Sequence, residues 1–109
     1  MIGNGMSAVE ALKSARLKIA GEKHWTKEVA ARDSQGHSID ATDKSAVCWC
    51  SLGALAAVTK EKYPFSAALL FLYARMENEV AKYNDFHEHA EVLAAWDAAI
   101  ADAETAVTA

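Results

Sequence analysis

Three side chains of this sequence have the chemistry of a nucleophilic site: Cys50, His89 and Asp85. A thiol near the start of a helix is activated by the helix dipole and by an imidazole, and a carboxylate can orient that imidazole. Cys50, however, lies within the run Ala46–Val58, in which Ser51 is the only polar side chain. A cysteine in such a run usually serves as a small hydrophobic residue. The sequence therefore favours no catalytic residue, and the three side chains remain the alternative set.

A metal site would use side chains from the same part of the chain. His87, His89, Asp85 and Cys50 are suitable donors, but two histidines spaced by two diverge on a helix, and no CxxC or HExxH motif is present. Cys48 and Cys50 would point about 200° apart on a helix, so they cannot bridge or chelate one ion together there. We expect no metal and no cofactor, and free thiols in a reducing cytoplasm.

The run Ala46–Val58 has apolar residues on every side when it is read at the helical period, so it predicts a helix enclosed by the rest of the fold. We expect this central helix to be capped near Asp43 and to run to about Lys62, because Pro64 prevents its continuation. Gly53 is expected at a close helix crossing, where a Cβ atom would clash. The other elements must then pack around this helix.

An amphipathic helix is predicted before the central one. Ser7 and Glu10 match a capping box, and Gly21 is a natural end for that helix. Between residues 22 and 40 the helical periodicity weakens, and residues 33–36 have the composition of a turn. An irregular loop or a short hairpin fits this stretch, and surface that carries function is expected there.

Two further helices are predicted after the central one. The first begins at Pro64 or Ser66 and ends at Asn84 and Asp85, for which helix capping is the favoured interpretation over ligand binding. The last helix begins near Phe86–His89 and carries a regular apolar face toward the core. Both helices therefore pack on the central one.

Composition agrees with a helical domain. The chain has 109 residues, 52% of them hydrophobic, with one proline and many alanines, which favour helices. We predict an all-α fold, a single compact domain over residues 1–109 with about four helices, a flexible start at 1–6 and a frayed tail at 105–109. The net charge of −4 argues against binding to nucleic acid or to an anionic membrane.

Several short motifs of the chain occur together in a known family. They are Trp25, Ala-Arg-Asp-Ser-Gln-Gly at 31–36, Trp49-Cys50-Ser51-Leu52-Gly53-Ala54-Leu55, Tyr83-Asn84-Asp85, and His89-Ala90-Glu91-Val92-Leu93 followed by Asp97 and Ala99-Ile100. With these motifs, residues 8–103 resemble a family of short bacterial and phage proteins that carries a domain-of-unknown-function label. Tyr83 and Glu88 depart from the Trp and Thr usual in that family. The resemblance implies a phage or mobile-element context and supplies no activity.

The sequence is best interpreted as a small acidic binding protein. Its expected binding residues are Trp25, Asn84, Asp85 and His89, and its expected partner is an unidentified protein, with inhibition of a host defence system as one special case. The simpler structural role for His89 is a hydrogen bond to a neighbouring loop. The alternative is a small enzyme or metal-binding protein that uses Cys50 with His89 and Asp85.

Self-association is a third option. The apolar run formed by Leu69, Leu70, Phe71, Leu72 and Tyr73 is wider than one helical stripe. An apolar face left over after the core is filled can pack against a second copy of the chain. The sequence therefore leaves a homo-oligomer open.

Overall fold

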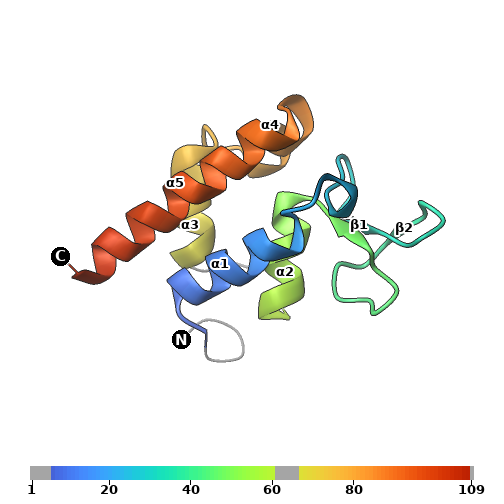
Figure 1. Ribbon diagram of the computed structural model, residues 1–109, viewed down its shortest axis with the longest axis horizontal. Helices are drawn as coiled ribbons and strands as arrows, with labels where there is room; N and C mark the ends of the chain where they lie inside the picture. The colour runs from blue at the N-terminus through green and yellow to red at the C-terminus, as the bar shows by residue number, and fades with distance from the viewer. Residues whose placement is uncertain (1–5, 61–66, 109) are drawn as a thin grey trace.

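In the computed structural model, which describes residues 6–60 and 67–108, most of the chain is helical (Figure 1). The α-helices are α1 (Ala8–Lys18), α2 (Ser51–Thr59), α3 (Ala67–Arg75), α4 (Val80–Phe86) and α5 (His89–Thr108). A 3₁₀ turn, η1 (Glu22–His24), and three short strands, β1 (Ala31–Arg32), β2 (Ser38–Ile39) and β3 (Cys48–Trp49), lie between α1 and α2. The predicted helical fold, with an irregular loop or a short hairpin between its first two helices, is confirmed: the described residues form a small three-stranded antiparallel sheet there.

The helix α1 begins at the predicted capping box. The Glu10 backbone N–H donates to Ser7 Oγ at 3.1 Å, and the Ser7 N–H donates to Glu10 Oε1 at 3.2 Å. Two backbone donors at the helix start are satisfied in this way. The helix ends at Ile19, its C-cap.

The sheet is antiparallel, with β1 between β2 and β3. Arg32 in β1 lies opposite Ser38 on one side and Cys48 on the other. The predicted turn joins β1 to β2: Asp33 Oδ1 accepts the backbone N–H groups of Gln35 and His37, each at 2.9 Å. The hydrogen bond from the His37 backbone is the largest cause that lowers the Asp33 pKa.

The prediction of one helix through Ala46–Val58 is wrong in its first part. Cys48 and Trp49 form β3, Cys50 is the N-cap of α2, and helical residues begin at Ser51. Trp49 is held in an extended conformation because it pairs with Ala31 of β1 and because its carbonyl accepts the Thr26 N–H at 3.0 Å. This pairing with distant segments outweighs the helical preference of the apolar run.

Gly53 lies at a close approach, as predicted, but its neighbour is a different element. A Cβ atom at this position would be 1.9 Å from the carbonyl oxygen of Ala30, in the segment that leads into β1. The same oxygen accepts the Cys50 N–H at 3.1 Å. The absence of a side chain at Gly53 therefore lets α2 lie close to the segment that leads into β1, and this glycine does not mark a helix crossing.

The predicted third helix is two helices, α3 and α4. The chain turns between them at Glu77 and Asn78, which have positive φ angles of 57° and 61°. The Asn78 N–H donates to the Tyr73 carbonyl at 2.8 Å, which closes the end of α3 in the manner of a Schellman motif. The predicted helix start at Pro64 or Ser66 lies outside the described residues.

The remaining boundaries differ less. Lys60, with φ 61°, is the left-handed C-cap of α2, and the expected end at Lys62 lies outside the described residues. The helix α5 begins at His89, as predicted, and continues to Thr108, through most of the segment for which we predicted fraying. The flexible start predicted for residues 1–6 falls almost entirely outside the described residues, which begin at Met6.

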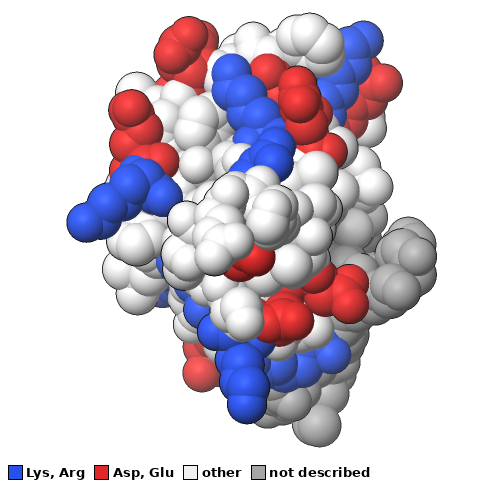
Figure 2. Space-filling model, turned by 90° about the vertical axis from the view of Figure 1, so that its right-hand side faces the viewer, with Lys and Arg blue, Asp and Glu red and all other residues white. Residues whose placement is uncertain are grey.

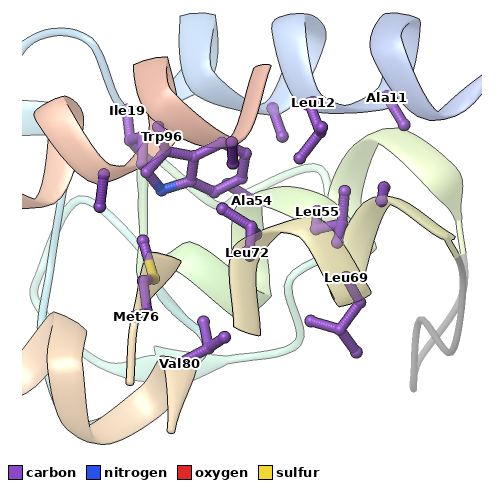
Figure 3. Packing of buried hydrophobic residues seen from close by; sticks show 14 of the residues in the cluster. Ala11, Leu12, Ile19, Ala54, Leu55, Leu69, Leu72, Met76, Val80 and Trp96 are labelled. Atoms are coloured by element: carbon purple, nitrogen blue, oxygen red, sulfur yellow. The ribbon is translucent and has the colours of Figure 1, made fainter. Parts of the chain in front are cut away.

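The core lies between α1, α2, α3 and α5 (Figure 3). Trp96 of α5 is its largest fully buried side chain. Its neighbours in the core are mostly aliphatic: Leu12, Ile19, Leu55, Leu69, Leu72, Met76, Val80 and Val92. None of the helices in the described ranges combines the length and hydrophobicity needed to cross a membrane.

Candidate functional site

The four predicted binding residues lie together, where the segment after α1 meets α4 and the start of α5. Trp25 Nε1 donates to Asn84 Oδ1 at 2.8 Å, and Asn84 Nδ2 donates to Asp85 Oδ1 at 3.3 Å. The rings of Trp25 and His89 have centroids 5.2 Å apart and are tilted by 39°. The structure thus brings together residues that are far apart in the sequence.

Asn84 is the centre of this cluster and is fully buried. Its Oδ1 also accepts the Ser51 backbone N–H at 3.0 Å and the Ser51 hydroxyl at 2.9 Å, while its Nδ2 donates to the Thr26 carbonyl at 3.0 Å. Ser51 Oγ in turn accepts Trp96 Nε1 at 3.0 Å. Asn84 therefore joins α4 to α2 and to the segment after η1. It lies within α4 and does not cap the end of that helix, but its Oδ1 satisfies the N–H of the first residue of α2.

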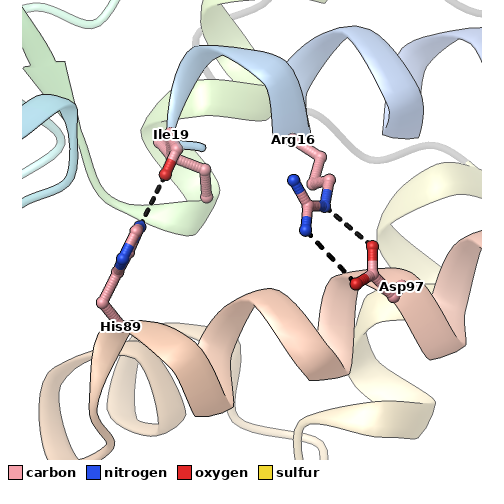
Figure 4. Close-up of polar contacts among 4 residues, drawn as sticks. All are labelled: Arg16, Ile19, His89 and Asp97. Carbon is pink, nitrogen blue, oxygen red and sulfur yellow. Dashed lines mark hydrogen bonds and ion pairs between the residues drawn. The ribbon is translucent and has the colours of Figure 1, made fainter. Parts of the chain in front are cut away.

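Asp85 and His89 make similar contacts with the backbone of other segments. Asp85 Oδ1 accepts the N–H of Glu28, a residue with φ 73°. His89 Nε2 donates to the Ile19 carbonyl at 2.7 Å and so satisfies a carbonyl at the end of α1 (Figure 4). Farther along α5, Arg16 and Asp97 join the same two helices with bonds of 2.7 and 3.2 Å (Figure 4). The simpler structural role considered for His89 fits this geometry.

Cys50 is at a helix start, contrary to the expectation that it lies well inside a helix. Its Sγ accepts the Gly53 N–H at 3.3 Å, which favours the thiolate, yet burial outweighs this contact and raises the pKa of the thiol. The side chain is 8% exposed. Among the contacts of the described residues, no hydrogen bond joins Cys50 to His89. In the alternative catalytic set, the Cys50 thiol is therefore protonated and enclosed, whereas a nucleophile needs an accessible thiolate.

The donors considered for a metal ion are also dispersed. His87 Nδ1 lies 2.9 Å from the Tyr83 carbonyl, and His89 is bound to Ile19. Within residues 6–60 and 67–108, no three histidine, cysteine, aspartate or glutamate side chains converge on a point where they could hold an ion. Cys48 and Cys50 are both free thiols.

Arg32 has a structural role that the sequence reasoning missed. Its guanidinium donates to Thr26 Oγ1 at 2.9 Å, to the Gly36 carbonyl at 3.0 Å and to the Lys27 carbonyl at 3.3 Å. These three bonds hold the loop before β1 against the turn that follows it. The fork of donors on arginine suits such a position because it reaches several acceptors at once.

A groove beside α4 is the candidate binding surface that the sequence did not indicate. This α4 groove has a volume of about 110 Å³ and is lined by Met76, Glu77, Glu79, Lys82, Tyr83, Phe86 and His87. Phe86 is 77% exposed. The rings of Tyr83 and His87 are stacked, with centroids 3.7 Å apart and an angle of 13° between their planes. Three ring side chains therefore stand beside one surface hollow.

Comparison with known proteins gives a family and no activity. Residues 4–102 match the model of a family described as "Family of unknown function (DUF6197)". The chain belongs to the DUF6197 family. No curated protein and no solved structure matches the chain. In this DUF6197 chain, the motifs by which we noted a family resemblance contain Asn84, Arg32, Gly53 and His89, whose described contacts join separate elements of the fold.

A second hollow of about 210 Å³ lies beside Trp49 and is bordered by three lysines. Lys18 is the last residue of α1 and Lys60 is the C-cap of α2, where basic side chains offset the negative end of the helix dipole. Lys18 Nζ also lies 4.5 Å from the centre of the Trp49 ring. Basic and acidic side chains are interspersed over the end of the molecule that carries the sheet (Figure 2). Two of the three lysines thus have positions that the fold itself explains.

Proposed function

We propose that this DUF6197 chain is a binding protein that contacts another protein through the α4 groove. The observation that carries the proposal is the exposure of Phe86, at 77%, beside the Tyr83–His87 stack. Large aromatic side chains supply much of the binding energy at protein interfaces. Burying most of a phenylalanine side chain is worth about 1.5–3 kcal/mol, and in the free protein this contribution is not realised.

The internal contacts of the other candidates support this choice of surface. Asn84 is fully buried, and His89 and Asp85 are bonded to backbone groups of neighbouring segments. The Cys50 thiol is enclosed, and burial raises its pKa. The predicted binding residues Trp25, Asn84, Asp85 and His89 then act indirectly, because they hold α4 and the start of α5 in place beneath the groove.

The setting proposed for this activity is the cytoplasm of a bacterium, with the gene on a phage or other mobile element. Two free cysteines suit a reducing compartment. The acidic net charge of −4 disfavours nucleic acid and anionic lipid as partners. An inhibitor of a host defence protein is one partner relationship that this setting allows.

Site-specific photocrosslinking tests the proposal. A photoreactive benzoylphenylalanine at Phe86 keeps an aromatic ring in the groove, and the same residue at Leu17, which is 74% exposed on α1, is the matched control. In cells that carry the gene, we expect a discrete crosslinked protein from position 86 and none of that mass from position 17.

Two results would contradict the proposal. One is equal crosslinking from both positions, which would show that the contacts do not depend on the groove. The other is a crosslink from position 86 only to a second copy of the chain, which would make the surface a homo-oligomer interface. Leu70 is 68% exposed on α3, so sizing by light scattering should accompany the experiment.

A further inference from the structure

We propose that the α4 groove receives an arginine side chain from a basic segment of the partner protein. This inference rests on the proposed function and adds the chemistry of the occupant. It is carried by the combination of ring side chains and carboxylates around one hollow, which suits a planar cation better than an apolar or acidic side chain.

The rings supply one half of this recognition. Phe86 is largely exposed and Tyr83 is partly exposed, so a ligand can lie against them. Arginine stacks on aromatic faces through its planar guanidinium, and its methylene groups cover apolar surface. His87 stacks on Tyr83 at 3.7 Å and keeps that ring in place.

The carboxylates supply the other half. Glu77 and Glu79 line the groove, and the charges of Glu91 and Glu77 both reach Tyr83, whose pKa is raised chiefly by burial and then by these two groups. Glu91 Oε1 accepts the Glu88 N–H at 3.1 Å, which fixes this carboxylate at the start of α5.

Lys82 is the basic residue among those that line the groove, and its Nζ lies 3.7 Å from Glu79 Oε2. An incoming guanidinium would compete with this lysine for the Glu79 carboxylate. The two lining glutamates, with Glu91 near Tyr83, leave the groove negative overall after Lys82 is counted. Its charge is therefore complementary to a cation.

The position of Glu77 is a further indication. At the end of α3 it occupies the left-handed C′ position, with φ 57°, where glycine is strongly preferred because other residues are strained there. A glutamate stands at this strained position, where it lines the groove and is exposed to solvent. Strained residues of this kind cluster at binding and catalytic sites.

The test uses a short blocked peptide with two arginines and the same peptide with citrulline, a neutral isostere, in their place. Binding to the isotope-labelled protein is followed by NMR. We expect the arginine peptide to shift the amide signals of Tyr83, Phe86 and His87, and the citrulline peptide to leave them in place. The shifts should diminish as salt is raised, because exposed charges are screened.

Two variants should change the affinity for the arginine peptide in opposite directions, and a third serves as the control. Glu77→Gly should weaken arginine-peptide binding about two- to fivefold, as expected for the loss of one exposed contact to a cation, and should raise the thermal midpoint because glycine relieves the strain. Lys82→Gln should strengthen binding by a similar factor. Glu22→Gln, a charge change at an exposed position of η1, is the control and should leave binding unchanged.

The outcomes separate the two proposals. If a partner protein crosslinks from position 86 but the arginine and citrulline peptides behave alike, the cationic occupant is wrong and the proposed function stands. If the arginine peptide binds as described but position 86 crosslinks no other protein, the proposed function is wrong. Tighter binding by Glu77→Gly, or no effect of Lys82→Gln, would also overturn the inference.

Discussion

Replacing Asn84 with alanine should be among the most destabilising single changes in this protein. Asn84 Oδ1 accepts both the backbone N–H and the hydroxyl of Ser51, and both residues are fully buried. A buried donor left without an acceptor costs about 1–3 kcal/mol, so two of them cost about 2–6 kcal/mol. The Trp25 indole and the Thr26 carbonyl also lose their partner, but both residues are only partly buried.

We therefore predict that Asn84→Ala lowers the free energy of unfolding by about 4 kcal/mol, a large part of the 5–15 kcal/mol typical of a domain. Urea denaturation followed by far-UV circular dichroism measures this difference. Lys82→Ala is the control, since it truncates an exposed side chain of the same helix and should change stability by less than about 0.5 kcal/mol.

A double-mutant cycle identifies the cause. Ser51→Ala removes the hydroxyl but keeps the backbone N–H, so in that background Asn84→Ala should lower the free energy of unfolding by about 2 kcal/mol less, which is the share of one buried donor. A loss below about 1 kcal/mol for Asn84→Ala alone would refute the reasoning, because it would mean that the buried donors of Ser51 do not depend on Asn84.

Two other changes test the fold and the thiol. Gly53→Ala should destabilise by about 1–3 kcal/mol or more in urea, because the new Cβ meets the Ala30 carbonyl; wild-type stability would contradict this close approach. Cys50 should react with iodoacetamide only after unfolding in a Cys48→Ser background, and rapid native labelling would oppose its enclosure. Burial in the folded state raises the Cys50 pKa above its ordinary value, so the free energy of unfolding should be unaffected by this thiol at neutral pH and should fall as the pH rises past about 9. In Cys50→Ala this fall should be less steep. The same dependence of unfolding free energy on pH in both proteins would contradict the prediction.

Local signals in the sequence predicted the helix boundaries where they were present. The capping box at Ser7 and Glu10 is complete within four residues, and the structure has the helix start there. The break after α3 lacks such a signal, because Glu77 stands where a glycine would have indicated the helix end. The sequence therefore supported one long helix where the chain forms α3 and α4.

The segment before α2 shows a different limit. A short apolar run is compatible with either a buried helix or a buried strand, and periodicity alone does not separate them. Cys48 and Trp49 are extended because β1 and the Thr26 N–H pair with them, and β1 is formed by residues well before them in the chain. The prediction for Cys50 depended on this assignment and changed with it.

The candidate site depended even more on the tertiary structure. Trp25 and Asn84 were both selected from the sequence, but their hydrogen bond joins positions 59 residues apart. Phe86 was taken only as part of a helix start, and its exposure follows from how α4 and α5 pack. Sequence motifs thus pointed to residues that build the fold, while the proposed binding surface required the structure.

The most direct test of the account measures two properties of Phe86→Ser: whether the partner protein still binds to it, and its free energy of unfolding. We predict that this variant is as stable as the wild-type protein within about 0.5 kcal/mol, because the side chain is largely exposed. It should nevertheless no longer bind the protein that crosslinks from position 86. Undiminished retention of that protein by the folded variant would contradict the claim that the α4 groove is the binding surface.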